Sequence, residues 1–201
     1  MTQDITRECP RDAILNAAGR LLGVYGYQKT TVDDIAHEAH MGKGTVYVYF
    51  HSKEEIAISW IDRVNEEIRG ALTTIAESQA PPADRLKKML EVRVMLRFDS
   101  AVGCTKSMDE LLASLRYILL EWRERWHEME ARIFANVLAE GRLTNAFEFD
   151  DVQSTARSLL VATNSLLPYS LSARQLGERD EVIREVDRIG DLLLSGLRTR
   201  S

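Results

Sequence analysis

The stretch Thr30–Lys53, TTVDDIAHEAHMGKGTVYVYFHSK, decides the fold of this chain. Its first half repeats apolar residues at helical spacing, which predicts a short helix with one apolar face: Val32, Ile35, Ala36 and Ala39. Thr30 or Thr31 precedes this helix as a candidate N-cap, and two aspartates follow in its first turn, where negative charge complements the helix dipole. A turn at 40–42 must come next, because a second short helix begins near Lys43.

The second half of the stretch predicts a helix with two different faces. Val46 and Phe50 are spaced to pack inward, whereas the remaining side chains are largely left to face outward: Lys43, Thr45, Tyr47 and Tyr49. Ser52-x-x-Glu55 is a capping box, which opens a further helix. Two short helices joined by a tight turn are typical of a helix-turn-helix, whose second helix fits the DNA major groove.

These residues resemble the N-terminal domain of the TetR family of bacterial transcriptional regulators, over roughly residues 11–60. The matching positions are Thr30–Thr31, Ile35–Ala36, Lys43–Tyr47, Tyr49–Phe50 and Ser52–Glu55. Two positions depart from the family's pattern: His40 stands where the turn usually has glycine, and Gly42 where the second helix usually has a serine cap. Histidine tolerates a left-handed conformation and glycine still caps a helix, so the departures concern local stability and base preference.

The resemblance implies an all-α fold with two domains. Residues 1–53 would form a three-helix helix-turn-helix DNA-binding domain, and residues 54–201 a helical effector-binding and dimerisation domain. A long helix at about 52–78 links them. The sequence supports this helix directly, because apolar residues follow one face from Ile56 to Ile75 and Pro81–Pro82 stop it.

The resemblance also implies which side chains contact DNA. Thr45 and Lys43 are the candidates for base-edge contact, and Gly44 would allow close approach to the groove. The candidates for phosphate or sugar contact are Thr31, Tyr47, Tyr49 and Lys53, with Tyr47 also a candidate for touching a base. The competing interpretation of each position is an ordinary exposed helix residue.

Composition and charge fit this interpretation. The chain has 201 residues, 45% of them apolar and 28% charged, with a net charge of −5. Residues 1–53 hold six basic and six acidic residues, so the whole acidic excess lies in the rest of the chain. The sequence shows no signal peptide and no membrane-length apolar run, which predicts a cytoplasmic protein without membrane partners. The two cysteines, Cys9 and Cys104, are therefore expected to stay reduced.

The body from residue 83 onward reads as helical throughout, with breaks expected at glycine and proline positions that include Gly141. Residues 171–179 are the expected mobile loop. The predicted helices span about 83–99, 105–113, 115–140, 150–167 and 179–199.

The last two of these helices carry wide apolar faces. One interpretation is monomer core; the other, implied by the resemblance, is a four-helix homodimer interface that would place two recognition helices on a palindrome. The residues assigned to this interface are Leu159, Thr163, Leu166, Val186, Ile189 and Leu193.

An aromatic and methionine stripe suggests an effector pocket in the body, although such a stripe is more often core. Its candidate lining residues are Met95, Phe98, Tyr117, Trp122, Trp126 and Phe134. Glu124-x-x-His127 has the spacing of a di-iron ligand pair, but the body has no second histidine, so no metal is expected. No catalytic motif appears, and neither enzymatic activity nor a cofactor is expected.

The function predicted is a ligand-responsive transcriptional regulator, with repression as the family's default. It would bind a palindromic double-stranded operator as a homodimer and be released by an unidentified small-molecule effector. Two alternatives stay open. One is an activator with the same DNA-binding head; the other is an α-helical small-molecule-binding protein or enzyme whose head no longer binds DNA.

Overall fold

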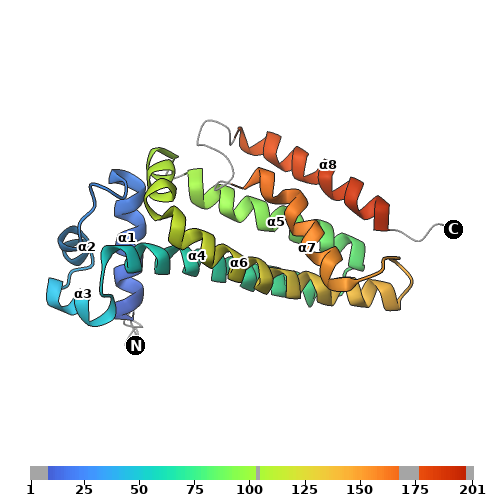
Figure 1. The fold of residues 1–201 in the computed structure, drawn as a ribbon, viewed down its shortest axis with the longest axis horizontal. Coiled ribbons are helices and arrows are strands. Elements are labelled where there is room, and N and C mark those ends of the chain that lie inside the picture. The colour runs from blue at the N-terminus through green and yellow to red at the C-terminus, as the bar shows by residue number, and fades with distance from the viewer. Residues whose placement is uncertain (1–8, 103–104, 168–176, 198–201) are drawn as a thin grey trace, which may run out of the picture. The chain divides into compact units, whose positions relative to one another are not determined.

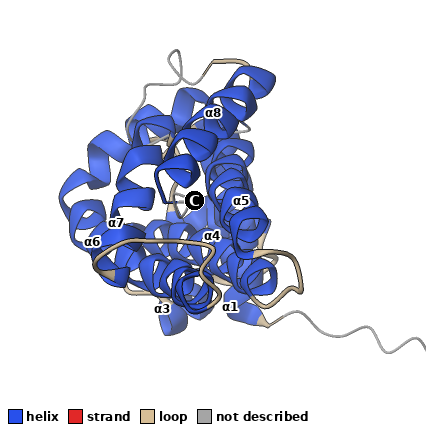
Figure 2. Ribbon diagram, turned by 90° about the vertical axis from the view of Figure 1, so that its right-hand side faces the viewer, coloured by secondary structure: helices blue, strands red, loops and turns tan. Residues whose placement is uncertain are grey.

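The computed structural model describes residues 9–102, 105–167 and 177–197, and this part of the chain is helical without a strand (Figures 1 and 2). The predicted all-α fold is confirmed. The helices are α1 (Pro10–Tyr25), α2 (Val32–Glu38), α3 (Lys43–Tyr49), α4 (Lys53–Ala76), α5 (Pro82–Val102), α6 (Thr105–Leu143), α7 (Val152–Thr163) and α8 (Arg179–Leu197), with a short 3₁₀ helix, η1 (Asn164–Leu166), after α7. The predicted mobile loop at 171–179 lies mainly outside the described residues, as does Cys104.

The chain divides into two compact units, and these differ from the predicted domains. The N-terminal unit comprises residues 9–63 and 105–116, and the C-terminal unit comprises 64–102, 117–167 and 177–197. Helices α4 and α6 each begin in the first unit and end in the second. The N-terminal unit therefore extends beyond the predicted boundary at residue 53, into α4 and the start of α6.

The core of the N-terminal unit is formed by the inward faces of α1 to α4. Pro10 opens α1 at a position where its missing N–H is not needed, and Gly26 ends that helix with φ of 84°. The side chains that fill the space between the helices are fully or almost fully buried: Ile14, Leu15, Ala18, Leu22, Ile35, Ala36, Val46, Phe50 and Ile56. This packing fixes α2 and α3 on the supporting helices.

In the C-terminal unit, α5 packs against both α7 and α8. Helix α8 presents Gly190 to α5, and a Cβ built on this glycine would make an ordinary van der Waals contact, 3.9 Å from the Leu90 Cδ1. Two surface ion pairs join the same helices: Lys87 donates to Asp191 at 2.8 Å, and Arg179 donates to Asp99 at 2.9 Å. Exposed pairs of this kind orient helices more than they stabilise them.

Three predicted boundaries were wrong. Helix α6 is one continuous helix of 39 residues, not two helices meeting near residue 114, because no glycine or proline interrupts that region. It also passes through Gly141, where a break was expected. This glycine is needed for packing, since a Cβ there would lie 2.2 Å from the Phe147 ring. Helix α7, by contrast, is shorter than the predicted helix at 150–167: it ends at Thr163 and is followed by η1, which begins at Asn164.

Replacing Gly141 with alanine is therefore expected to destabilise the chain by about 1–3 kcal/mol, because the methyl group would collide with Phe147. Gly196→Ala is the matched control. Nothing lies within 4 Å of a Cβ at Gly196, so alanine there should be neutral or stabilising by up to about 1 kcal/mol. Urea unfolding of both variants measures the difference. Equal midpoints would refute the packing role of Gly141.

Candidate nucleic-acid interface

Helix α2 begins at a complete capping box. The Thr31 hydroxyl accepts a hydrogen bond from the Asp34 backbone N–H at 3.2 Å and donates to the Asp34 carboxylate at 2.7 Å. The same carboxylate accepts from the Thr31 backbone N–H at 2.9 Å and has a lowered pKa, chiefly through its hydrogen bonds to Thr31. Of the two predicted caps, Thr31 is the one used, because Thr30 is buried and donates to the Gly26 carbonyl. The hydroxyl assigned to phosphate contact is thus engaged in the cap.

The turn between α2 and α3 has the geometry that the sequence predicted. His40 has φ of 54°, and the Met41 N–H donates to the Ala36 carbonyl at 2.8 Å, which is the wide hydrogen bond of a left-handed helix end. Gly42 then caps α3 through its backbone carbonyl alone, without a side-chain hydrogen bond. The turn holds α3 in a fixed direction relative to α2.

Helix α3 has one buried and one exposed face, as predicted. Val46 and Phe50 are buried, at 0% and 1% exposure. The outward residues are all exposed: Lys43, Gly44, Thr45, Tyr47, Val48 and Tyr49. Val48 was missed by the sequence interpretation, although its position two residues after an inward valine could have revealed it. The exposed face is compact, uncharged beyond Lys43, and of the size that enters a major groove.

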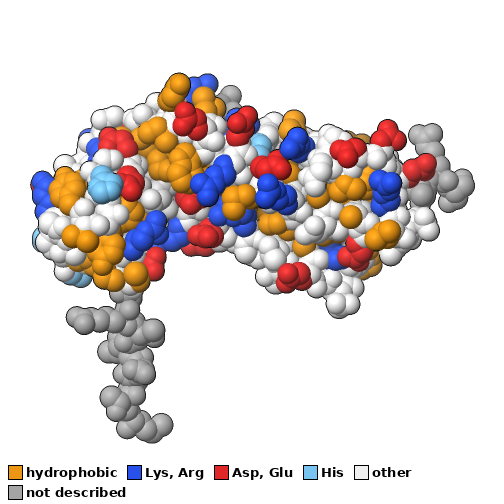
Figure 3. All heavy atoms as spheres, turned by 60° about the horizontal axis from the view of Figure 1, so that its bottom comes forward, with side chains coloured by type: hydrophobic (Ala, Val, Ile, Leu, Met, Phe, Trp, Pro, Cys, Tyr) orange, Lys and Arg blue, Asp and Glu red, His pale blue; other side chains and the backbone are white. Residues whose placement is uncertain are grey.

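The ammonium group of Lys43 forms an exposed ion pair with Asp33. It donates a hydrogen bond to the Asp33 carboxylate at 2.8 Å, and this bond raises the pKa of the lysine. The ion pair joins the first turn of α3 to the first turn of α2 and is exposed, so phosphate or base acceptors could compete for it. Acidic and basic side chains are interspersed in the same way on the face of the molecule shown in Figure 3.

Lys53 is similarly engaged with its own unit. Its ammonium group donates to the Tyr27 carbonyl at 2.9 Å and lies 4.3 Å from the centre of the Tyr27 ring. The Tyr27 hydroxyl donates to Glu54 at 3.0 Å, and its pKa is raised, mainly by burial. Tyr27 was not singled out from the sequence. It fixes the start of α4 against the loop after α1, so the tip of the Lys53 side chain has a defined position.

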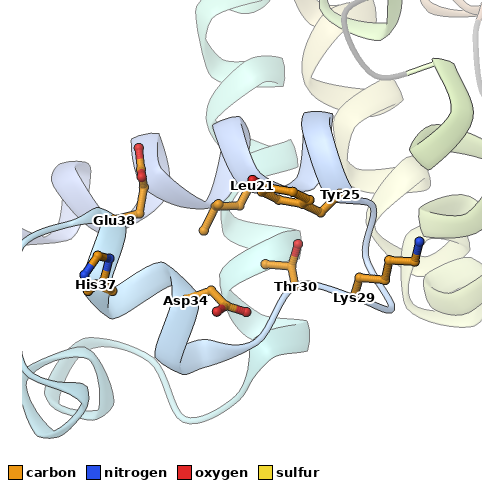
Figure 4. A pocket seen from close by; sticks show the side chains of 7 residues that line it. All are labelled: Leu21, Tyr25, Lys29, Thr30, Asp34, His37 and Glu38. Carbon is orange, nitrogen blue, oxygen red and sulfur yellow. The ribbon is translucent and has the colours of Figure 1, made fainter.

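A hollow of about 420 Å³ lies between α1 and α2 (Figure 4). Its lining residues are Leu21, Tyr25, Lys29, Thr30, Asp34, His37 and Glu38. The principal acceptors among them are already used within the chain, since Asp34 completes the capping box and Glu38 accepts from Arg20 at 2.7 Å. Most of the lining residues are polar, whereas small-molecule sites are lined mainly by apolar side chains.

The candidate effector-pocket residues in the C-terminal unit do not share one environment. Met95, Phe98, Trp126 and Phe134 are buried, Trp122 is partly exposed, and Tyr117 is 80% exposed. Trp122 and Trp126 stack at an angle, with ring centres 5.9 Å apart. The buried four belong to the core of the unit, whereas Tyr117 projects from the surface of α6.

A buried charge cluster, which the sequence interpretation missed, lies beside them. Arg93 and Arg97 both donate to Glu130, with an Arg93 Nε to Glu130 Oε2 distance of 2.7 Å, and Arg93 also donates to Thr163 at 2.8 Å. Burial alone would raise the pKa of Glu130, but Arg97 and Arg93 outweigh it and hold that pKa at about 2. The cluster ties α5, α6 and α7 together.

His127 borders this cluster. Its Nε2 lies 3.3 Å from Arg93, and burial, followed by the charge of Arg93, lowers its pKa to about 4. The positive charge of Arg93 disfavours a metal cation at His127. Glu124, the other candidate ligand of the Glu124-x-x-His127 motif, is exposed. Among the described residues, no three potential ligands are grouped as a metal site.

No described helix is both long and apolar enough to cross a bilayer.

The residues assigned to a dimer interface also separate into two groups. Leu159, Thr163 and Val186 are buried within the single chain, so they belong to its own core. Leu166, Ile189 and Leu193 are partly exposed. Larger apolar exposure on the same helices comes from Val161, at 62%, and Leu192, at 74%. Of the six residues assigned to the interface, three are thus buried within the chain and three are partly exposed.

The capped α2, the left-handed turn and the two-faced α3 define a helix-turn-helix unit. Residues 14–59 match the family model described as bacterial regulatory proteins, tetR family. The helix-turn-helix part of the chain is therefore of the TetR type. The resemblance stated from the sequence is confirmed.

Two relatives resemble the chain in sequence, and a solved structure has the same fold. The chain is 29% identical over 106 residues to the HTH-type transcriptional regulator LmrA of Bacillus subtilis, covering 52% of this chain and 54% of that protein. It is 26% identical over 148 residues to the Fatty acid metabolism regulator protein of Bacillus subtilis, covering 70% and 69%. The alignment thus spans about half the length of the first relative and about two thirds of the second. A transcriptional regulator from Cytophaga hutchinsonii has the same fold, with a TM-score of 0.77 at 22% identity, covering 94% of this chain and 98% of that one.

An Asp33→Asn change is expected to strengthen DNA binding, because it removes a negative charge beside α3 and releases Lys43 from its ion pair. The plot of log affinity against log salt should become steeper by about one, as for one added phosphate contact. The control is Glu38→Gln, which removes a charge of the same sign from the Arg20 pair on the same helix. A salt slope that shifts equally in both variants would show that Lys43 makes no phosphate contact of its own.

Proposed function

We propose that the protein is a transcriptional repressor that binds a palindromic operator as a homodimer and is released by a small-molecule effector. The observation that carries the proposal is the exposed face of α3, held outward by the burial of Val46 and Phe50. A seven-residue helix with small and hydroxylated outward groups suits the major groove. An activator with the same head would use the same interface and stays the alternative.

Dimerisation through α7 and α8 is supported by an exposed apolar side chain on each helix, Val161 and Leu192, which a second copy of the chain would cover. A two-fold pair of these surfaces would present two copies of α3 to one duplex. We therefore place Val161, Leu192 and the partly exposed Ile189 in the interface, in place of Leu159, Thr163 and Val186.

Control by an effector is supported by the course of α4, a single helix of 24 residues that begins soon after α3 and ends in the C-terminal unit. The ligand would bind among Met95, Phe98, Trp126 and Phe134. If it binds more tightly to a dimer with one distance between its two DNA-binding domains than to a dimer with another, it shifts operator occupancy. The name of the Fatty acid metabolism regulator relative supports targets in fatty acid metabolism. The proposal includes a cytoplasmic location and no catalytic activity, since LmrA and the other relative are regulators.

Selection from random duplex DNA by the purified protein tests this function. The native protein is expected to enrich a palindrome, whereas a Lys43→Ala/Tyr47→Ala protein of the same oligomeric state is expected to enrich none. Enrichment by both proteins, or by neither across low to physiological salt with ligand-free refolded protein, would contradict the proposal. Release of the selected duplex by a candidate effector then separates repression with release from its alternatives.

A further inference from the structure

The recognition helix exposes an aliphatic side chain that the proposed function does not yet use. Val48, the next-to-last residue of α3, is 76% exposed, although its neighbours in the sequence, Tyr47 and Tyr49, are markedly less exposed. Valine is not among the strongest helix formers, and its exposed methyl groups gain nothing from water. In the free chain, Val48 thus contributes little to folding.

The surroundings of Val48 would let its methyl groups reach a base. One turn earlier on the same face stands Gly44, and nothing lies within 4 Å of a Cβ built there. The backbone of α3 can therefore approach a groove closely at this face. The single charged residue of α3, Lys43, is directed to Asp33 at 2.8 Å. Beyond Lys43, the exposed face of α3 therefore carries no charge, and Val48 is its exposed aliphatic side chain.

The chemistry of the major groove gives such a side chain one specific partner. Guanine, cytosine and adenine present hydrogen-bond donors and acceptors there, and thymine adds an apolar 5-methyl group. Valine has no side-chain donor or acceptor, so it can distinguish bases only by apolar contact. In a helix, its χ1 angle is also almost fixed, so little rotamer freedom is lost on binding.

We propose that Val48 is a specificity-determining residue that contacts the 5-methyl group of a thymine in each half-site. This inference rests on the proposed DNA-binding function and adds a base identity to it. It assigns Thr45 the polar contacts and Val48 the apolar contact on the same face of α3.

The test uses the duplex selected by the native protein, with deoxyuridine replacing thymine one position at a time in both half-sites. Deoxyuridine pairs like thymine but lacks the methyl group. At one position the native protein should bind the uracil duplex more weakly, by about fourfold per half-site, the effect of one buried methyl group. The Val48→Ala protein should bind the thymine and uracil duplexes equally at that position. Val24→Ala, which shortens another exposed valine of the same unit, should keep the native preference.

Three results would overturn the inference. They are a selected half-site without thymine, a native protein indifferent to every uracil, and a Val48→Ala protein with the native preference intact. Each of them leaves DNA binding itself in place. Failure of the proposed function would instead appear earlier, as the absence of any selected duplex, so the two failures are distinguishable.

Discussion

A Gly44→Glu variant is expected to lose specific DNA binding by at least about a hundredfold while keeping or slightly raising its thermal stability. The reason is that a Cβ at this position meets nothing within 4 Å, so the side chain fits the free protein. Any residue with a better helix propensity than glycine also favours α3. In the complex, the same side chain would occupy the space between the helix backbone and the base edges and bring a negative charge to the phosphates.

The matched control is Gly70→Glu. Gly70 is an exposed glycine in α4 with equally open surroundings, and glutamate there adds the same charge and the same gain in helix propensity. Its operator affinity should stay within a factor of about two of the native value, since exposed changes remote from a site are nearly additive. If Gly44→Glu bound the selected duplex as tightly as Gly70→Glu, α3 would not be the DNA-contacting helix.

The second large effect concerns the buried cluster in the C-terminal unit. Glu130→Gln is expected to destabilise the protein by about 3–5 kcal/mol, because it leaves two buried guanidinium groups without a counter-charge. Arg93 and Glu130 are both 0% exposed, so water cannot replace the lost partner. Against a total stability of about 5–15 kcal/mol, this is a major loss.

Two further variants show whether the charge or the packing matters. Glu128→Gln removes an exposed carboxylate from the same helix, where it pairs with Arg157, and should cost less than about 1 kcal/mol. Replacing Arg93, Arg97 and Glu130 together with methionine should recover most of the stability, because no uncompensated charge remains. Chemical denaturation of the three proteins measures these differences. A triple variant as unstable as Glu130→Gln would contradict the electrostatic explanation.

The same cluster predicts acid sensitivity. Folding lowers the pKa of His127 to about 4, so between about pH 6.5 and 4 the unfolded chain binds the extra proton and stability falls with pH. Glu130, with a folded pKa of about 2, loses its contribution at lower pH, from about 5 towards 2. A His127→Gln protein should therefore lose less stability than the native protein between pH 6.5 and 4, as measured by its unfolding midpoints. Parallel curves for the two proteins would contradict the assignment.

The helix-turn-helix could be predicted from the sequence because its determinants are local. The Thr31 cap, the His40 turn and the inward Val46 all lie within a few residues of the groups that they organise. The pairing of Lys43 with Asp33 could not be predicted, although it bears on the site, because it depends on how α2 and α3 cross.

The C-terminal unit was less predictable for the same reason. Arg93 and Glu130 are 37 residues apart in the sequence, and no local sequence pattern around either residue predicts that they pair. Val186 carries the same apolar signal whether it faces the chain's own core or a partner, so periodicity cannot separate the two. In the sequence, Gly141 predicts the end of a helix. Only the position of Phe147 shows that glycine is needed there because a side chain would collide with the ring.

The most direct test of the central claim is to find which groove of the selected duplex the protein covers. Dimethyl sulfate methylates guanine N7 in the major groove and adenine N3 in the minor groove. The account predicts that the native protein protects guanine N7 within two half-sites about one helical turn or a multiple of it apart, and that Gly44→Glu protects none. Protection confined to adenine N3, or the same guanine protection by Gly44→Glu, would contradict the placement of α3 in the major groove.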